Sequence, residues 1–210
     1  MSKNINIMIM GGGSERCHVF SEMGPIYKAF LTKAGFDVTL TENRDDFCKD
    51  KIAPYDLIID YTTEGDLTED QSCGLLNGII AGKGFIGIHS AADSFKNTPG
   101  YISMLGGKFL THPKQQPLTF NIKNHHHPVT KGLNDFEMVE ELYLMETIGH
   151  FDLLMSTWYD GFEHPITWVK PYGHGRVLYT AFGHGKEQTE HPHFQQLIIN
   201  GVHWVCRREN

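Results

Sequence analysis

The stretch Gly84-Phe85-Ile86-Gly87-Ile88-His89-Ser90-Ala91-Ala92-Asp93 decides the fold class of this chain. It begins as a short apolar run and reaches His89 where a strand would turn into a helix. Small residues at Gly87 and Ala91 flank that turn, which is the pattern of a nucleophile elbow. In hydrolases the elbow carries Ser or Cys, whereas this one carries His89 with Ser90 beside it. The alternative is a buried histidine that caps a strand-to-helix turn.

Strand and helix signals alternate through the first half of the chain. Short apolar runs predict strands at residues 5–10, 36–40, 55–60 and 84–88. Apolar residues at helical spacing predict helices at about 23–33 and at 67–81. Continuous apolar strands separated by helices are typical of a parallel sheet that is covered on both faces. The sequence therefore predicts a doubly wound α/β fold.

The second half has a different pattern. Strands are predicted at residues 118–122, 141–146, 153–158, 166–170 and 176–181, and turns rather than long helices join them. These strands should therefore be partly antiparallel additions to the sheet. An amphipathic helix is predicted at 193–207. Since no linker, repeat or low-complexity segment interrupts the pattern, we predict one domain over residues 1–210.

The composition excludes several classes of partner. The formal net charge of −7 argues against nucleic acid, whose phosphates require a clustered basic face. The four cysteines show neither C-x-x-C nor zinc-finger spacing. No stretch approaches the ~20 apolar residues of a membrane span. We therefore predict a cytoplasmic protein that binds neither nucleic acid nor a membrane, and a homo-oligomer is compatible with the sequence.

The 13 histidines are the compositional feature that points to chemistry, since imidazole serves as acid, base or metal ligand near neutral pH. Ligands of open parallel sheets bind outside the carboxyl ends of the strands. That rule selects His18, Glu64, His89 with Asp93, and His184. The glycines at 11–13 could cradle an anion or simply form a turn.

Two further groups of residues are candidates for ligand contact. Glu141 and Tyr143 should share one face of a predicted strand, where a carboxylate and a phenol could hold sugar hydroxyls or move a proton. A solvated strand end is the alternative. Tyr172, in a glycine-bounded turn, is placed to stack on a sugar ring.

Several of these motifs together resemble the ThuA-like (trehalose-utilisation) family. The resemblance runs from the first strand to the last helix and is carried by Gly84–Asp93, Leu105–Phe109 with His112-Pro113, Glu140–Tyr143, His164–His184 and Ile199–Trp204. It implies the class I glutamine amidotransferase-like fold, which has a flavodoxin-like sheet. It also implies a role in sugar metabolism, often of keto-sugars or disaccharides.

Glutaminase activity is not expected, in spite of that fold. Amidotransferases of this type place a cysteine at the elbow and a His-x-Glu pair after a late strand. Here His89 occupies the elbow, and the late element reads His184-Gly-Lys-Glu187, with one extra residue. Without an elbow thiol there is no thioester chemistry.

The first functional hypothesis is an enzyme that acts on a carbohydrate or keto-sugar by proton transfer, in a hydrolysis, β-elimination or isomerisation. His89 or His184 would be the base, the other histidine or Glu141 the acid, and Asp93 would orient His89. The substrate would be bound by His18, Ser90, His112, Tyr143 and Tyr172.

Two other hypotheses remain open. The second is a non-catalytic carbohydrate-binding or regulatory module on the same fold. The third is a metal-dependent hydrolase that binds zinc or manganese, because imidazole and carboxylate ligands suit these ions. The candidate ligands are His89, Asp93, His112, Glu141 and His184. No cofactor is required by the sequence itself.

Overall fold

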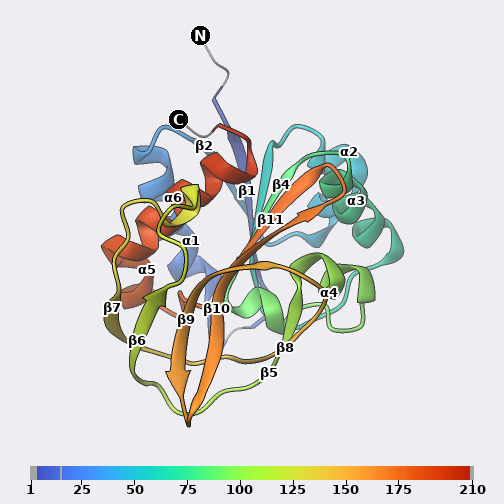
Figure 1. Cartoon of the computed structure of the whole chain (residues 1–210). Coiled ribbons are helices and arrows are strands. Elements are labelled where there is room, and N and C mark those ends of the chain that lie inside the picture. Colours follow the sequence, from blue (N-terminus) through green and yellow to red (C-terminus); the bar gives the residue numbers. More distant parts are fainter. Residues whose placement is uncertain (1–3, 15, 209–210) are drawn as a thin grey trace.

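The computed structural model describes residues 4–14 and 16–208 of the chain. Within these residues the main sheet has nine strands in the order β2-β1-β3-β4-β11-β10-β9-β6-β7 (Figure 1). The first five strands of that order run parallel: β2 (Asp37–Thr41), β1 (Asn6–Gly12), β3 (Leu57–Thr62), β4 (Gly84–Ile88) and β11 (Gly175–Thr180). The other four pair antiparallel: β10 (Phe162–Tyr172), β9 (Asp152–Tyr159), β6 (Gln116–Ile122) and β7 (Phe136–Glu140). The predicted fold class, mostly parallel with antiparallel additions, is confirmed.

Helices cover both faces of the parallel strands (Figure 1). One face carries α1 (Phe20–Lys33), α5 (Lys186–Glu190) and α6 (Pro192–Val205), and the other carries α2 (Lys49–Ile52), α3 (Glu69–Ile80) and α4 (Pro99–Leu105). Successive residues of β1 alternate between the two layers. Ile7 and Ile9 belong to the core that includes α1 and α6, whereas Met8 and Met10 belong to the core that includes α3 and α4. This double burial explains the continuous apolar run of the strand.

Short elements complete the chain. Three 3-10 helices, η1 (Arg44–Phe47), η2 (His89–Asp93) and η3 (Pro128–Thr130), connect larger elements. A separate two-stranded sheet pairs β5 (Gly107–Thr111) with β8 (Leu144–Thr147). The sequence patterns did not predict β5, β7 or α4, each of which has only five to seven residues.

The helix predicted at 67–81 begins later because of a capping box. The backbone N–H of Gln71 donates to Thr68 Oγ1 at 3.3 Å, and that of Thr68 donates to Gln71 Oε1 at 2.9 Å. These two bonds satisfy N–H groups that the first turn of a helix leaves free. Residue Glu69 therefore starts α3.

The strand predicted at 141–146 is wrong in its bounds. β7 ends at Glu140, residues 141–143 form a connection, and β8 begins at Leu144 in the small sheet. The physical reason is a local hydrogen bond, since the backbone N–H of Glu141 donates to the Glu140 carboxylate at 2.8 Å. That bond takes the N–H group away from strand pairing. The argument that Glu141 and Tyr143 share a strand face therefore does not apply.

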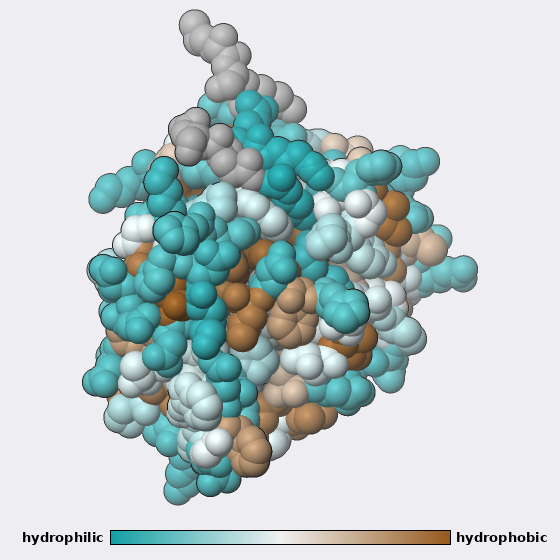
Figure 2. Space-filling model, in the orientation of Figure 1, coloured by the Kyte–Doolittle hydropathy of each residue, from teal (hydrophilic) through white to brown (hydrophobic). Residues whose placement is uncertain are grey.

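The surface is mainly hydrophilic. In the view of Figure 2, teal residues cover most of the molecule and hydrophobic residues show as small patches between them. No helix among the described residues is both long enough and apolar enough to cross a membrane.

The direction of the strands determines where the loops meet. Because β1, β3, β4 and β11 are parallel, their carboxyl ends lie at one edge of the sheet. The loops that follow β1, β4 and β11 carry His18, His89 and His184. Residues far apart in the sequence are thereby brought to a common edge.

Candidate functional site

His89 lies at the turn from β4 into η2, with a positive φ of 45°. The turn needs Gly87, because a Cβ there would lie 2.6 Å from Leu105 Cδ1. The His89 ring is fully buried, and its Nδ1 lies 2.7 Å from the carbonyl oxygen of Ala181. A carbonyl can only accept, so Nδ1 carries a proton. In neutral His89 the free lone pair therefore sits on Nε2.

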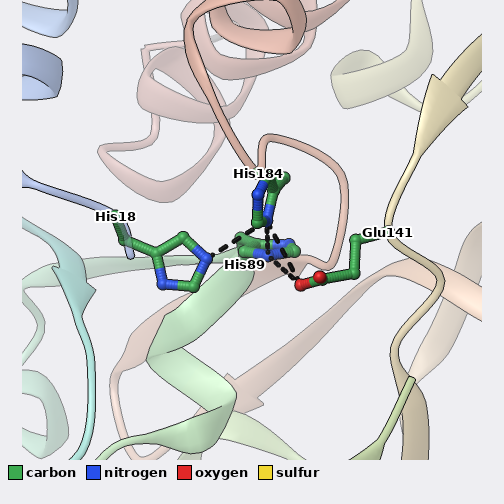
Figure 3. A group of neighbouring side chains, drawn as sticks. All are labelled: His18, His89, Glu141 and His184. Carbon is green, nitrogen blue, oxygen red and sulfur yellow. Dashed lines mark hydrogen bonds and ion pairs between the residues drawn. The ribbon is translucent and has the colours of Figure 1, made fainter. Parts of the chain in front are cut away.

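The rings of two other histidines lie beside that of His89 (Figure 3). His184 follows β11 and places its Nδ1 3.1 Å from His89 Nε2. His18 follows β1, also with a positive φ of 56°, and places its Nε2 3.2 Å from the same His184 Nδ1. The other nitrogen of His18, Nδ1, lies 3.0 Å from Thr63 Oγ1 in the loop after β3.

Glu141 closes this group from the connection between β7 and β8 (Figure 3). Its Oε2 lies 3.2 Å from His184 Nδ1 and 3.4 Å from His89 Nε2. One donor atom from each of His18, His89, Glu141 and His184 lies within 4.8 Å of all the others. We call these residues the four-residue cluster. It contains only side chains that transfer protons or bind metals.

The charges of the cluster are strongly coupled. Burial, followed by the neighbouring histidines, lowers the pKa of His18 to about 3, so this ring is neutral near pH 7. Burial alone would lower the pKa of His184, but the hydrogen bond and charge of Glu141 outweigh it and raise the pKa. Burial would raise the pKa of Glu141, but the close contacts with the His184 and His89 rings hold that pKa well below the usual range. Glu141 is therefore a carboxylate.

Aromatic rings line the cluster on the side of η2 and β5. The ring of Tyr143 packs on His89 with centroids 4.0 Å apart, and Phe109 packs on Tyr143 at 4.2 Å. His112 is more exposed, and its Nδ1 lies 3.2 Å from Glu141 Oε1. The structure thus places Tyr143 and His112, both predicted ligand contacts, next to the cluster.

Three predicted site residues lie elsewhere or act differently. Asp93 forms an ion pair with Lys96, and the Ala181 carbonyl, rather than Asp93, orients His89. Ser90 is fully buried, and its Oγ has no hydrogen-bond partner among the described residues, so it makes no hydrogen bond to the cluster.

Tyr172 lies at the opposite end of the strands from the cluster. It pairs with Gly175, the first residue of β11, whereas His184 follows the last residue of that strand. A strand of six residues spans ~17 Å. Tyr172 is therefore not a neighbour of the cluster, because the turn before a strand and the loop after it lie at opposite ends.

The backbone of the glycine-rich loop after β1 packs closely against the loop after β3. A Cβ at Gly13 would lie 1.9 Å from the carbonyl oxygen of Thr63, and φ is +101°. Glycine is therefore needed here for packing against the loop after β3, which favours the turn interpretation over an anion cradle.

Glu140 is a residue of the site that the sequence patterns did not reveal. It is 1% exposed, and its Oε2 accepts hydrogen bonds from the backbone N–H groups of Gly183 at 2.8 Å and His184 at 3.4 Å. Its Oε1 accepts from Glu141 N, and burial raises its pKa. This carboxylate therefore ties the loop that carries His184 to the segment that carries Glu141. In sequence it looked like one of two acids at a solvated strand end.

A pocket of about 620 Å³ lies beside the cluster. Its lining includes His18 and His184 of the cluster together with residues of α1 and α5. Arg16 and Lys186 contribute positive charges, while Glu22 and Glu190 contribute negative ones. The volume lies in the range of small-molecule sites in proteins.

Comparison with known proteins assigns the chain to a family. The sequence model of the ThuA family, described as trehalose utilisation, matches residues 6–205. The chain belongs to this family, and the resemblance seen in the sequence motifs is confirmed. The family description connects the chain with carbohydrate use. A comparison with curated proteins gives no match.

Solved structures support the same fold. A ThuA-like protein from Parabacteroides merdae superposes with a TM-score of 0.87 at 21% identity, covering 97% of this chain and 90% of that one. A ThuA-like protein from Bacteroides uniformis gives a TM-score of 0.83 at 24% identity, with coverages of 98% and 93%. At these identities the similarity shows the fold and nothing further about activity.

Proposed function

We propose that the protein is an enzyme of carbohydrate metabolism that transfers a proton to or from a sugar or keto-sugar at the four-residue cluster. The observation that carries the proposal is the contact of His89 Nε2, at 3.1 Å, with His184 Nδ1, which in turn lies 3.2 Å from Glu141. The lone pair of His89 thus lies beside the ion pair of His184 and Glu141, and His184 also lines the pocket.

The surroundings of each group support the role that we propose for it. The Ala181 carbonyl fixes the tautomer of His89 and leaves Nε2 as the base. The pair of His184 and Glu141 holds a proton that can be delivered to a substrate oxygen. Removal of a proton beside a ketone requires a positioned base together with a group that stabilises the developing enolate oxygen, and this arrangement supplies both.

Tyr143 and His112 are the proposed contacts for sugar hydroxyls. Tyr143 stacks on His89, and His112 contacts Glu141 from the exposed side. The hydroxyl of Tyr143 makes no hydrogen bond within the described parts of the chain, so it is available to a ligand. Both side chains lie beside the groups that would react.

The test is turnover of a panel of monosaccharides, disaccharides and their 3-keto derivatives, followed by NMR spectroscopy of the products. We expect conversion of at least one sugar, with His89→Ala and His184→Ala each slower by ~10²–10⁴-fold, the usual effect of losing a general acid or base. His150→Ala, which removes an exposed histidine, is the matched control.

Two results would contradict the proposal. One is sugar binding, measured by calorimetry, without conversion at any pH, which would indicate a binding or regulatory module. The other is wild-type turnover in both alanine variants on a substrate that the native protein converts.

A further inference from the structure

The contacts within the four-residue cluster leave too few protons for the atoms that meet there. His89 Nε2 carries a lone pair, because Nδ1 holds the ring proton against Ala181 O. Glu141 presents a carboxyl oxygen, and His18 presents Nε2, the ring nitrogen that does not face Thr63 Oγ1. All three approach His184 Nδ1, at 3.1, 3.2 and 3.2 Å. A single nitrogen holds at most one proton, so it cannot satisfy three acceptors.

The alternative tautomer of His18 does not resolve this conflict. If His18 Nε2 carried the proton, it would donate to the lone pair of His184 Nδ1. His184 would then have no proton at Nδ1 to offer to His89 or Glu141, and their lone pairs would face that nitrogen without a donor. In either case several lone pairs converge on one small region, which is costly for buried groups unless a positive charge lies between them.

We propose that the four-residue cluster binds one divalent first-row metal ion, zinc or manganese, through His18 Nε2, His89 Nε2, His184 Nδ1 and a Glu141 oxygen. The separations of neighbouring donor atoms agree with this assignment. Zinc bonds to nitrogen and oxygen of ~2.0–2.1 Å in a tetrahedron place neighbouring ligand atoms ~3.3 Å apart. Four of the six separations among these atoms range from 3.1 to 3.4 Å, and the other two lie within 4.8 Å.

His89 and His18 make the second hydrogen bond that is typical of metal-binding histidines, through the ring nitrogen that does not face the centre of the cluster. A ligating imidazole almost always donates its second N–H to a carbonyl, a carboxylate or another oxygen, which fixes the ring. His89 Nδ1 has Ala181 O for this purpose, and His18 Nδ1 has Thr63 Oγ1. Both rings therefore present Nε2 to the centre without any rearrangement.

The buried negative charges also call for a cation. Glu141 contributes one carboxylate to the cluster, and Glu140 lies directly behind it. Within residues 4–14 and 16–208, neither forms an ion pair with a lysine or arginine. A divalent ion at the centre of the cluster would compensate both carboxylates.

This ligand set differs from the one suggested by the sequence. Asp93 is paired with Lys96. Among the described residues, the polar partners of His112 are the Glu141 carboxylate and the carbonyl oxygen of Pro113. His18, which the sequence suggested as a substrate contact, replaces them. The metal ion would occupy His89 Nε2 and His184 Nδ1, the nitrogens that the proposed function uses as base and acid, so proton transfer by these rings belongs to the metal-free cluster. The metal proposal rests on the cluster geometry and can fail independently of the proposed function.

The test is titration of chelator-treated protein with zinc and with manganese, by calorimetry together with elemental analysis. We expect one ion per chain, and at least ~100-fold weaker binding in His18→Ala and Glu141→Gln, beyond the loss typical of an outer contact. His150→Ala and His126→Ala, which remove exposed histidines, are the matched controls and should bind as the native chain does. Because an alanine variant can fail to fold, melting curves accompany each titration, and anomalous diffraction from the native protein locates the ion.

Several results would overturn the metal proposal. These are binding that is unchanged in both ligand variants, an anomalous peak at His125–His127 instead of the cluster, or no binding of either ion. If the metal-free protein still converts a sugar and binds no ion, the metal proposal fails while the proton-transfer function stands. If one ion binds at the cluster but no sugar is converted, the metal proposal stands and the enzymatic one fails.

Discussion

His89 Nε2 and His184 Nδ1 lie 3.1 Å apart although 95 positions separate them in the chain. The adjacent parallel strands β4 and β11 bring them together, because each histidine belongs to the loop that follows its strand. Glu141 then reaches both rings from the connection that follows β7. The site is therefore a product of strand order, and its behaviour should depend on each of these contacts.

The first prediction concerns the titration of His184 in the metal-free protein. Since Glu141 raises the pKa of His184, Glu141→Gln should lower the pKa of this ring, by an amount measurable in ring carbon shifts by NMR spectroscopy. A raised pKa stabilises the fold below the unfolded value of ~6.5, and this stability is lost as pH rises through the folded value. The native metal-free protein should therefore lose stability above neutral pH relative to Glu141→Gln. An unchanged His184 titration would contradict this account of the ion pair.

The second prediction concerns Glu140 as a positioning residue. Glu140→Gln replaces one acceptor oxygen by an NH₂ group that faces backbone N–H donors, so we expect a loss of about 1–3 kcal/mol in the free energy of unfolding. Turnover should fall as well, mainly in kcat, because the loop of His184 and the segment of Glu141 lose their common anchor. Glu137→Gln, at an exposed position of the same strand, is the control for both measurements. If both variants behave alike in urea unfolding and kinetics, Glu140 has no positioning role.

The third prediction concerns the turn beneath His89. A Cβ at Gly87 would lie 2.6 Å from Leu105 Cδ1 and 3.2 Å from the Tyr179 ring. Gly87→Ala should therefore destabilise the protein by about 1–3 kcal/mol through overpacking. Gly78→Ala, in the last turn of α3 where the nearest atoms lie 3.5 Å away, should be neutral or stabilising. Thermal unfolding of both variants checks this, and equal melting temperatures would argue against a tightly packed turn.

The fourth prediction is chemical and negative. Glutamine incubated with the protein should release no more ammonia than a buffer blank, because His89 stands where an amidotransferase would need a thiol. Cys17 is the thiol to watch, since it lines the pocket beside His18. Ammonia release that survives purification and disappears in Cys17→Ser would contradict the prediction. It would show that Cys17 acts as the nucleophile in place of a thiol at the elbow.

Much of the fold could be predicted because its signals are local. The apolar run of β4, the helical spacing of α3 and the alternation of strands with helices each depend on a few neighbouring residues. The elements that escaped prediction, such as β5 and β7, are short and half-exposed, so their side chains carry no clear period. Their positions depend on pairing with distant strands.

The cluster was only partly predictable. The rule that ligands bind beyond the carboxyl ends of parallel strands selected His18, His89 and His184 from 13 histidines. Glu140 escaped because its partners are backbone N–H groups of a loop more than 40 residues away. The same rule could have excluded Tyr172. A hairpin turn that precedes a parallel strand lies at the amino end of that strand, opposite to the carboxyl end where ligands bind.

The central claim is that His89 and Glu141 act in one reaction centre, and a double-variant measurement of kcat/KM tests it most directly. His89→Ala and Glu141→Gln should each reduce kcat/KM by ~10²–10⁴-fold. Groups that act as a unit show strongly non-additive losses, so the double variant should be no more than about 10-fold slower than the slower single variant. Glu141→Gln combined with His150→Ala is the control and should behave as Glu141→Gln alone. If instead the losses from His89→Ala and Glu141→Gln multiply, the two residues contribute independently and the cluster is not a single catalytic centre.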